Sequence, residues 1–244
     1  MIHISTSHVE TELLGRPVID LLNIADEKSL RTHAHAALKT HRPILMTCKL
    51  PAKRVDLIDA AEEIGFRMVE CQIYLRRPLY GKPEPIYKSR FTYSSVECDQ
   101  DLEEILEFAP ATFQTDRFSL DPHLGPEFAA RRYHQYIEEA YTNPEQGLFC
   151  LRDEKTKQIV MFHSFRKKSA REVQGLLEAA RPDRQGEGLA DIFGSHINNL
   201  FKSRGFRVIT TAVSAANFRT LSRLLHYQGQ TISKAMVALH KHCE

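Results

Sequence analysis

Residues 178–218 read EAARPDRQGEGLADIFGSHINNLFKSRGFRVITTAVSAANF, and this stretch decides how the chain is organised. It opens with the end of an apolar run that is typical of a strand. Residues 189–205 carry apolar side chains at helical spacing, and 206–213 are apolar again, which predicts a helix and then a strand. A loop, QGEGLA at 185–190, connects the first strand to the helix, and Asn217 begins a further helix.

The glycine loop has two physical interpretations. The N–H groups in the first turn of a helix lack intrahelical partners and carry a partial positive charge, so a helix start attracts phosphate. Gly186 and Gly188 remove side chains that would block a ligand, and they permit backbone angles that other residues avoid. A plain turn from strand to helix uses glycine for the same backbone reason. The loop alone therefore leaves both interpretations open.

The rest of the chain alternates strands and helices, with one hairpin in the middle. Besides 189–205, helices are expected over 29–41, 52–65, 99–110, 125–141 and 217–229. Besides 206–213, strands are expected over 42–50, 66–77, 90–98, 147–153, 158–165, 171–180 and 230–242, with a short apolar run at 15–24. This pattern predicts an α/β fold with a mixed sheet flanked by helices.

We expect two domains, a small α/β domain over 1–85 and a larger one over 86–244. Between them, residues 78–87 read PLYGKPEPIY, and three prolines and a glycine disfavour a helix or a central strand there.

Composition narrows the class of protein. The chain has 244 residues, 42% hydrophobic and 26% charged, which is ordinary for a soluble globular protein. With 33 basic and 31 acidic residues its net charge is +2, so no overall field favours nucleic acid or a membrane surface. Five cysteines without close pairing suit reduced thiols. There is no leader-like N-terminus and no membrane-length apolar run, so we expect a cytoplasmic protein.

The loop resembles a known signature. Gln185, Gly188 and Ala190 match the Gln-x-x-Gly-x-Ala pattern with which the GCN5-related N-acetyltransferases (GNAT) bind the pyrophosphate of acetyl-CoA. Pro182 stands where many members carry proline, and Asn217 stands where the family places an asparagine beside the pantetheine arm. A dinucleotide-binding Gly-x-Gly-x-x-Gly fingerprint fails at the third glycine, and a P-loop lacks its Gly-Lys-Ser/Thr ending.

The resemblance implies a GNAT-like catalytic domain that binds acetyl-CoA as co-substrate, with the strand before the loop splayed from its neighbour. The cofactor-binding residues that it implies are Ala179, Ala180, Gln185, Gly186, Glu187, Gly188, Leu189, Ala190 and Asn217. Amides around Glu178, Ala179 and Ala180 would then serve the thioester.

Residues 115–141, TDRFSLDPHLGPEFAARRYHQYIEEAY, narrow the resemblance to the dTDP-fucosamine acetyltransferase group, which also carries a truncated GNAT-like N-terminal domain. That group implies an amino sugar, or its nucleotide conjugate, as acceptor. Arg117, Asp121 and Tyr133 are the candidate substrate-binding residues, although surface charge and core packing explain them equally well.

Acetyl transfer to an amine needs a base for the amine proton and an acid for the departing thiolate. Glu178 and His163 lie on adjacent expected strands that lead to the loop, and either can serve as the base. The family's usual tyrosine acid is missing, because Leu224 and Leu225 occupy its region. Tyr227 is a substitute or a packing residue.

Three alternatives to an amino-sugar acetyltransferase stay open. The chain can acetylate another small amine, such as a polyamine, an amino acid or an aminoglycoside. It can sense an acyl-CoA without turnover, which the missing tyrosine favours. It can also be a scaffold that forms a homodimer through its N-terminal unit. We expect no metal, because neither HAH at 33–35 nor HKHCE at 240–244 has further ligands at suitable spacing.

Overall fold

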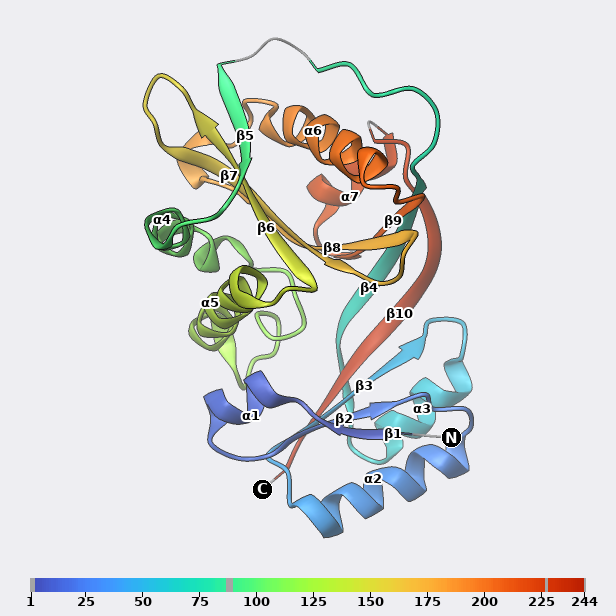
Figure 1. Ribbon diagram of the computed structural model, residues 1–244. Helices are drawn as coiled ribbons and strands as arrows, with labels where there is room; N and C mark the ends of the chain where they lie inside the picture. Colours follow the sequence, from blue (N-terminus) through green and yellow to red (C-terminus); the bar gives the residue numbers. More distant parts are fainter. Residues whose placement is uncertain (1–2, 87–89, 227, 244) are drawn as a thin grey trace.

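A computed structural model describes residues 3–86, 90–226 and 228–243, which form one ten-stranded mixed sheet with helices on both faces (Figure 1). The strands are β1 (His3–Thr6), β2 (Val18–Leu22), β3 (Leu45–Pro51), β4 (Arg67–Pro78), β5 (Phe91–Ser95), β6 (Gln146–Asp153), β7 (Ile159–Lys167), β8 (Glu172–Ala180), β9 (Val208–Ser214) and β10 (Thr231–His242). The helices are α1 (His8–Leu14), α2 (Glu27–His41), α3 (Val55–Glu63), α4 (Asp99–Phe108), α5 (Gly125–Thr142), α6 (Leu189–Ser203) and α7 (Phe218–His226), with short 3₁₀ turns at Pro110–Thr112 and Pro182–Arg184.

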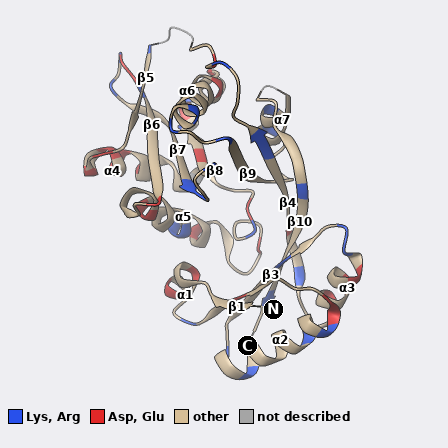
Figure 2. Cartoon of the chain, turned by 45° about the vertical axis from the view of Figure 1, so that its right-hand side comes forward, with Lys and Arg blue, Asp and Glu red and all other residues tan. Residues whose placement is uncertain are grey.

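The predicted α/β fold with a mixed sheet is confirmed. The expected elements are present, shifted by a few residues at their ends, and the structure adds β1 and α1, which the sequence analysis did not predict. Both are short, and the strand is too brief to show a clear alternation of apolar and polar residues. No helix among the described residues has the length and apolar character needed to cross a membrane. Basic and acidic residues are interspersed over the whole chain (Figure 2).

Strand β10 lies in the middle of the sheet. The strand order is β1-β2-β3-β10-β4-β9-β8-β7-β6-β5, so β10 pairs antiparallel with both β3 and β4. Strand β4 in turn pairs with β9, and these pairings carry the sheet from the part that bears α1–α3 to the part that bears α4–α7 (Figure 1). Strands from both expected domains, 1–85 and 86–244, thus belong to one continuous sheet. A domain boundary at residue 85 stays a prediction.

The hydrophobic core is divided in the same way. One cluster packs α2 and α3 on β2 and β3, and it includes Val237 and Leu239 from β10. A second cluster packs α6 against β7 and β8, with Phe193 and Phe201 fully buried. A third packs α4 and α5 on the opposite face of β6 and β7. Strand β8 contributes Val173 to the second cluster and Ala179 to the third, and it leads to the glycine loop.

Candidate active site

Strands β8 and β9 separate in the middle of the sheet. They pair in parallel only from Glu172 opposite Val208 to Gln174 opposite Thr210, although β8 continues to Ala180. Thr211 Oγ1 still donates a hydrogen bond to the carbonyl oxygen of Gly175 at 3.2 Å, where the separation begins. Beyond Gly175, the described register gives β8 no partner on its β9 side. This is the splay that the sequence resemblance implies.

The backbone amides of β8 can be assigned to a side. The N–H of Leu177 donates to Ser164 Oγ at 3.1 Å, and the N–H of Arg181 donates to the carbonyl oxygen of Val160 at 2.9 Å, so both point at β7. Because successive amides of a strand point to opposite sides, those of Glu178 and Ala180 face the gap. The amide of Ala179 faces β7. The two gap-facing amides are therefore available to a carbonyl oxygen.

The glycine loop after β8 adopts the left-handed backbone that glycine allows. Gly186 has φ +95° and Gly188, the residue before α6, has φ +72°. Such angles strain any residue with a Cβ. Residues 185–188 are exposed, whereas Leu189 is buried in the second core cluster. The loop is anchored at its helix end and open to solvent at its centre.

The main-chain donors of this loop are unoccupied. Within the described ranges, no protein atom accepts a hydrogen bond from the N–H of any residue from 185 to 190. Arg219, at the start of α7, lies beside the loop, since a Cβ on Gly186 would be 3.9 Å from its Nη2. No hydrogen bond or ion pair engages Arg219 in the part of the chain that the structure describes. Free amides and a free guanidinium together suit a phosphate.

Asn217 and Glu187 have local partners. Asn217 Oδ1 accepts the N–H of Thr220 at 3.2 Å, so this side chain caps α7. Glu187 forms a salt bridge with Arg184, whose Nε lies 2.5 Å from Glu187 Oε1. Arg184 also contacts the buried Asp153 at 2.9 Å. The negative charge of Glu187 is therefore balanced by Arg184, which reduces its repulsion of an anion bound at the loop.

Glu178 and His163 face each other across β8 and β7, directly opposite in register. Glu178 Oε2 lies 3.4 Å from His163 Nδ1, and Glu178 Oε1 accepts a hydrogen bond from Arg223 Nη2 at 2.5 Å. Burial raises the pKa of Glu178, but Arg223 and His163 outweigh burial and hold this pKa below its usual value. Glu178 is therefore ionised at neutral pH.

The imidazole of His163 is buried beside the point where the strands separate. Its exposed fraction is 6%; its Nδ1 faces Glu178 at 3.4 Å, and its Nε2 has no polar partner among the described residues. It fits because Gly175 has no side chain: a Cβ there would lie 3.2 Å from His163 Cε1. A buried ring nitrogen without a polar partner is costly, so His163 is a candidate for a chemical role.

Known structures share this architecture. No protein-family model and no curated protein matches the chain by sequence. A GCN5-related N-acetyltransferase from Sphaerobacter thermophilus aligns with a TM-score of 0.70 at 13% identity, over 99% of this chain and 76% of that one. A tandem GNAT protein from the clavulanic acid biosynthesis pathway aligns with a TM-score of 0.65 at 11% identity, over 93% of this chain and 76% of that one. This chain has the GNAT fold.

A third structure with the GNAT fold is a glucosamine N-acetyltransferase region in a fungal multi-domain β-N-acetylglucosaminidase. It aligns with a TM-score of 0.59 at 12% identity, over 98% of this chain and 31% of that one. The splayed strands and the loop of this chain thus occur within an architecture that several N-acetyltransferases share.

Tyr227, the predicted general acid, lies outside the described residues. Leu224 is buried in a small cluster with Leu75 and Val213, and Leu225 packs against it. Neither leucine can donate a proton. Tyr227 stays a prediction.

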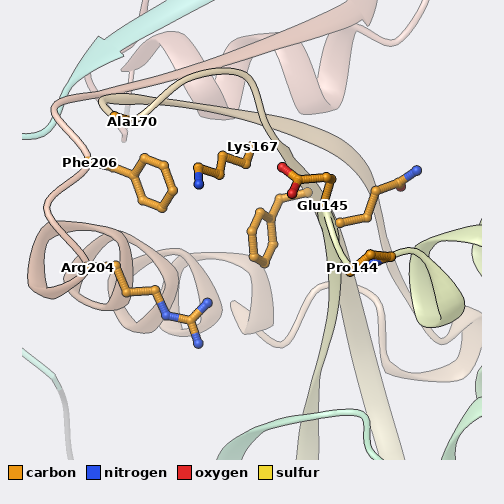
Figure 3. A pocket seen from close by; sticks show the side chains of 8 residues that line it. Pro144, Glu145, Lys167, Ala170, Arg204 and Phe206 are labelled. Atoms are coloured by element: carbon orange, nitrogen blue, oxygen red, sulfur yellow. The ribbon is translucent and has the colours of Figure 1, made fainter.

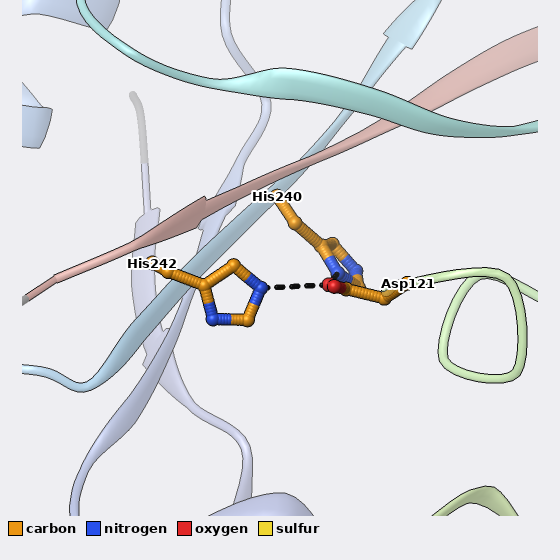
Figure 4. A group of neighbouring side chains, drawn as sticks. All are labelled: Asp121, His240 and His242. Atoms are coloured by element: carbon orange, nitrogen blue, oxygen red, sulfur yellow. Dashed lines mark hydrogen bonds and ion pairs between the residues drawn. The ribbon is translucent and has the colours of Figure 1, made fainter. Parts of the chain in front are cut away.

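The three predicted acceptor residues lie on α5 and on the segment that precedes it. Tyr133 is buried and stacks on Phe113 with ring centroids 4.2 Å apart. The guanidinium of Arg117 lies over the ring of Phe118, 4.7 Å from its centroid. Asp121 is 1% exposed, and its carboxylate contacts two histidines of β10 (Figure 4). Of the three, Arg117 is the most available to a ligand.

A cluster of polar side chains on β3 and β4, centred on the buried Glu70, was not predicted from the sequence. Lys49 Nζ donates to Gln72 Oε1 at 2.7 Å, and Gln72 Nε2 donates to Glu70 at 2.7 Å. The backbone N–H of Arg117 also donates to Glu70, at 3.2 Å. Burial raises the pKa of Glu70 and lowers that of Lys49 to about 7. Polar residues inside the apolar runs LMTCKLP and VECQIY were the signal in the sequence.

Two cavities lie away from these residues. One of about 360 Å³ lies where β6 begins, β7 ends and α6 ends, and Figure 3 shows Lys167, Arg204 and Phe206 around it. Another of about 560 Å³ lies along α5 and is lined by Leu13, Leu106 and Gln135 among others. Neither contains a predicted site residue.

Proposed function

We propose that this protein is an acyl-CoA-dependent N-acetyltransferase. The observation that carries the proposal is the set of unoccupied main-chain donors at 185–190, placed between a splayed strand and α6 in a GNAT fold. A diphosphate bound there would accept these N–H groups and approach Arg219. Acetyl-CoA supplies the activated acyl group as a thioester.

The gap between β8 and β9 is the proposed place of reaction. The amides of Glu178 and Ala180 would donate to the thioester oxygen and stabilise the negative charge that forms on it. The amine nitrogen attacks the carbonyl carbon, the carbon–sulfur bond breaks, and the thiolate takes a proton from an acid, for which Tyr227 is our candidate. Asn217 is expected to lie beside the pantetheine arm.

His163 is our choice for the base. Glu178 is held ionised by Arg223, and a carboxylate with a lowered pKa is a weak proton acceptor. The same carboxylate is suited to orient His163 through Nδ1, which leaves Nε2 to take the amine proton. Glu178 is then a positioning residue, held in place by Arg223. The guanidinium of Arg223 also donates to the carbonyl oxygen of Ala190 at 3.3 Å.

For the acceptor we propose an amino sugar or its nucleotide conjugate. The support is the resemblance of residues 115–141 and the fungal neighbour, which is named as a glucosamine N-acetyltransferase region. Arg117 would contact the acceptor. Release of CoA thiol during screening of amino sugars, polyamines, amino acids and aminoglycosides identifies the acceptor class.

The decisive test is calorimetric titration of acetyl-CoA into the wild type, Gly188→Asp and Gly205→Asp. Gly205, at the end of α6, also has a positive φ (+85°) and open space around it, so its variant introduces the same charge and strain elsewhere. We expect Gly188→Asp to lower the affinity for acetyl-CoA by about 100-fold, because the added carboxylate would repel the negatively charged diphosphate. Gly205→Asp should bind as the wild type does. Absence of wild-type binding would overturn the proposal.

A further inference from the structure

Three ligand-type side chains converge on one point at the end of β10. His240 and His242 are two residues apart on a strand, so both project from the same face. Asp121 reaches them from the turn before α5 (Figure 4). Asp121 Oδ2 lies 2.6 Å from His240 Nδ1 and 2.8 Å from His242 Nε2, and the three ligand atoms all lie within 4.8 Å of one another.

From this geometry we propose that Asp121, His240 and His242 bind a divalent transition-metal ion, with Zn²⁺ as the best match. Two imidazole nitrogens and one carboxylate oxygen form a donor set that Zn²⁺ prefers. Oxygen-selective ions such as Mg²⁺ and Ca²⁺ do not favour two imidazoles. Spacing along the chain could not reveal this set, because Asp121 is remote in sequence from the two histidines.

The surroundings already orient the ligands. Asp121 Oδ1 accepts the backbone N–H of His123 at 2.9 Å, so its Oδ2 is directed at the histidines. The ring of His240 packs on Phe118, with centroids 5.2 Å apart, and the ring of His242 packs on that of His123 at 4.5 Å. Partners that fix ligand orientation are typical of metal sites.

Little movement is needed for the ion to enter. Tetrahedral bonds of about 2.0–2.1 Å place ligand atoms about 3.3 Å apart. The present separations of 2.6 and 2.8 Å would therefore widen by well under about 1 Å. His242 is 29% exposed and is the last residue of β10, so it is the ligand most free to move and the route to solvent. Water can occupy the fourth position.

The ion would join two distant parts of the chain. It would tie β10 to the turn before α5, and the same segment carries Phe118 and Arg117. A bound metal would thus fix the segment proposed to contact the acceptor, without taking part in acyl transfer.

The test uses the full chain freed of metal with a chelator and titrated with Zn²⁺ alone. We expect one Zn²⁺ per wild-type chain, an affinity lower by about 100-fold in His242→Ala, and a thermal midpoint that Zn²⁺ raises only in the wild type. His35→Ala, which removes an exposed histidine of α2, is the matched control and should retain both.

Two results of the Zn²⁺ titration would overturn the site. One is absence of Zn²⁺ uptake by the wild type, and the other is an equal loss in His242→Ala and His35→Ala. Because His242→Ala can perturb folding, Co²⁺ is also added to the wild type as a spectroscopic probe. The intense visible bands of four-coordinate Co²⁺ are expected, and a spectrum of hexaaqua Co²⁺ would refute the proposal as well.

Discussion

The glycine loop at 185–190 and the site formed by Asp121, His240 and His242 differ in whether their polar atoms have protein partners. At 185–190 the chain leaves a row of main-chain donors without protein acceptors, and the loop is exposed. At Asp121 the carboxylate is 1% exposed and accepts a backbone N–H and two imidazole contacts. Unpaired donors at the surface are hydrated and can exchange water for a ligand, whereas a buried carboxylate must be paired for the fold to be stable.

This contrast separates two kinds of expected mutational effect. Changes around the loop and the strand gap should alter binding or turnover while the fold persists. Changes at Asp121 should alter the free energy of unfolding first. His163 lies between these cases, because it is buried like Asp121, whereas its Nε2 lacks a polar partner among the described residues, as the N–H groups of the loop do.

The largest effect is expected for His163→Ala. Removal of a general base lowers turnover by about 10²–10⁴-fold, while the affinity for acetyl-CoA should stay that of the wild type. Steady-state kinetics with the identified acceptor and calorimetry with acetyl-CoA measure the two quantities. Unchanged turnover would mean that His163 has no catalytic role. His163 would then be a buried structural residue, as Asp121 is.

Asp121→Asn should destabilise the fold by about 3 kcal/mol, because it weakens buried charge-assisted hydrogen bonds. Burial raises the pKa of Asp121, but the hydrogen bonds from His240 and His242 outweigh burial and leave this pKa below its usual value. The ionised carboxylate therefore stabilises the fold above the unfolded pKa of about 3.9, and this contribution is lost as the pH falls.

Urea unfolding of both proteins, freed of metal, at several pH values checks this prediction. The difference between wild type and Asp121→Asn should shrink below about pH 4. A difference that does not depend on pH would show that the charge of Asp121 does not contribute.

The smallest effect is expected for Arg219→Ala. An exposed guanidinium contributes about 1 kcal/mol to anion binding, so the acetyl-CoA dissociation constant should rise about fivefold, with a weaker dependence on salt. Arg207→Ala, an exposed arginine at the opposite end of β9, is the control and should leave both quantities unchanged. Equal effects in the two variants would indicate only a general loss of positive charge.

Much of the fold was predictable because the signals were local. Helical periodicity located α2, α3 and α6, and apolar runs between turn residues located β3 to β10. The expected strands also placed His163 and Glu178 on adjacent strands, and the structure adds that the two residues lie opposite each other.

The missing parts depend on contacts between remote segments. Nothing in the residues around Arg223 indicates that its guanidinium reaches Glu178 on another element. The sequence near His240 does not reveal that Asp121, from the turn before α5, completes a group of three. The central position of β10 likewise follows only from pairing with β3 and β4.

The place of β10 has a consequence for biosynthesis. Residues 231–242 fill the interior of a unit whose other strands and helices come from the first 78 residues. During translation β3 and β4 emerge long before β10, the strand that lies between them. Until β10 is synthesised, the backbone N–H and C=O groups of β3 and β4 that pair with it have no partner in the sheet. Non-local pairing of this kind slows folding, and we expect the nascent chain to depend on chaperones until β10 has left the ribosome.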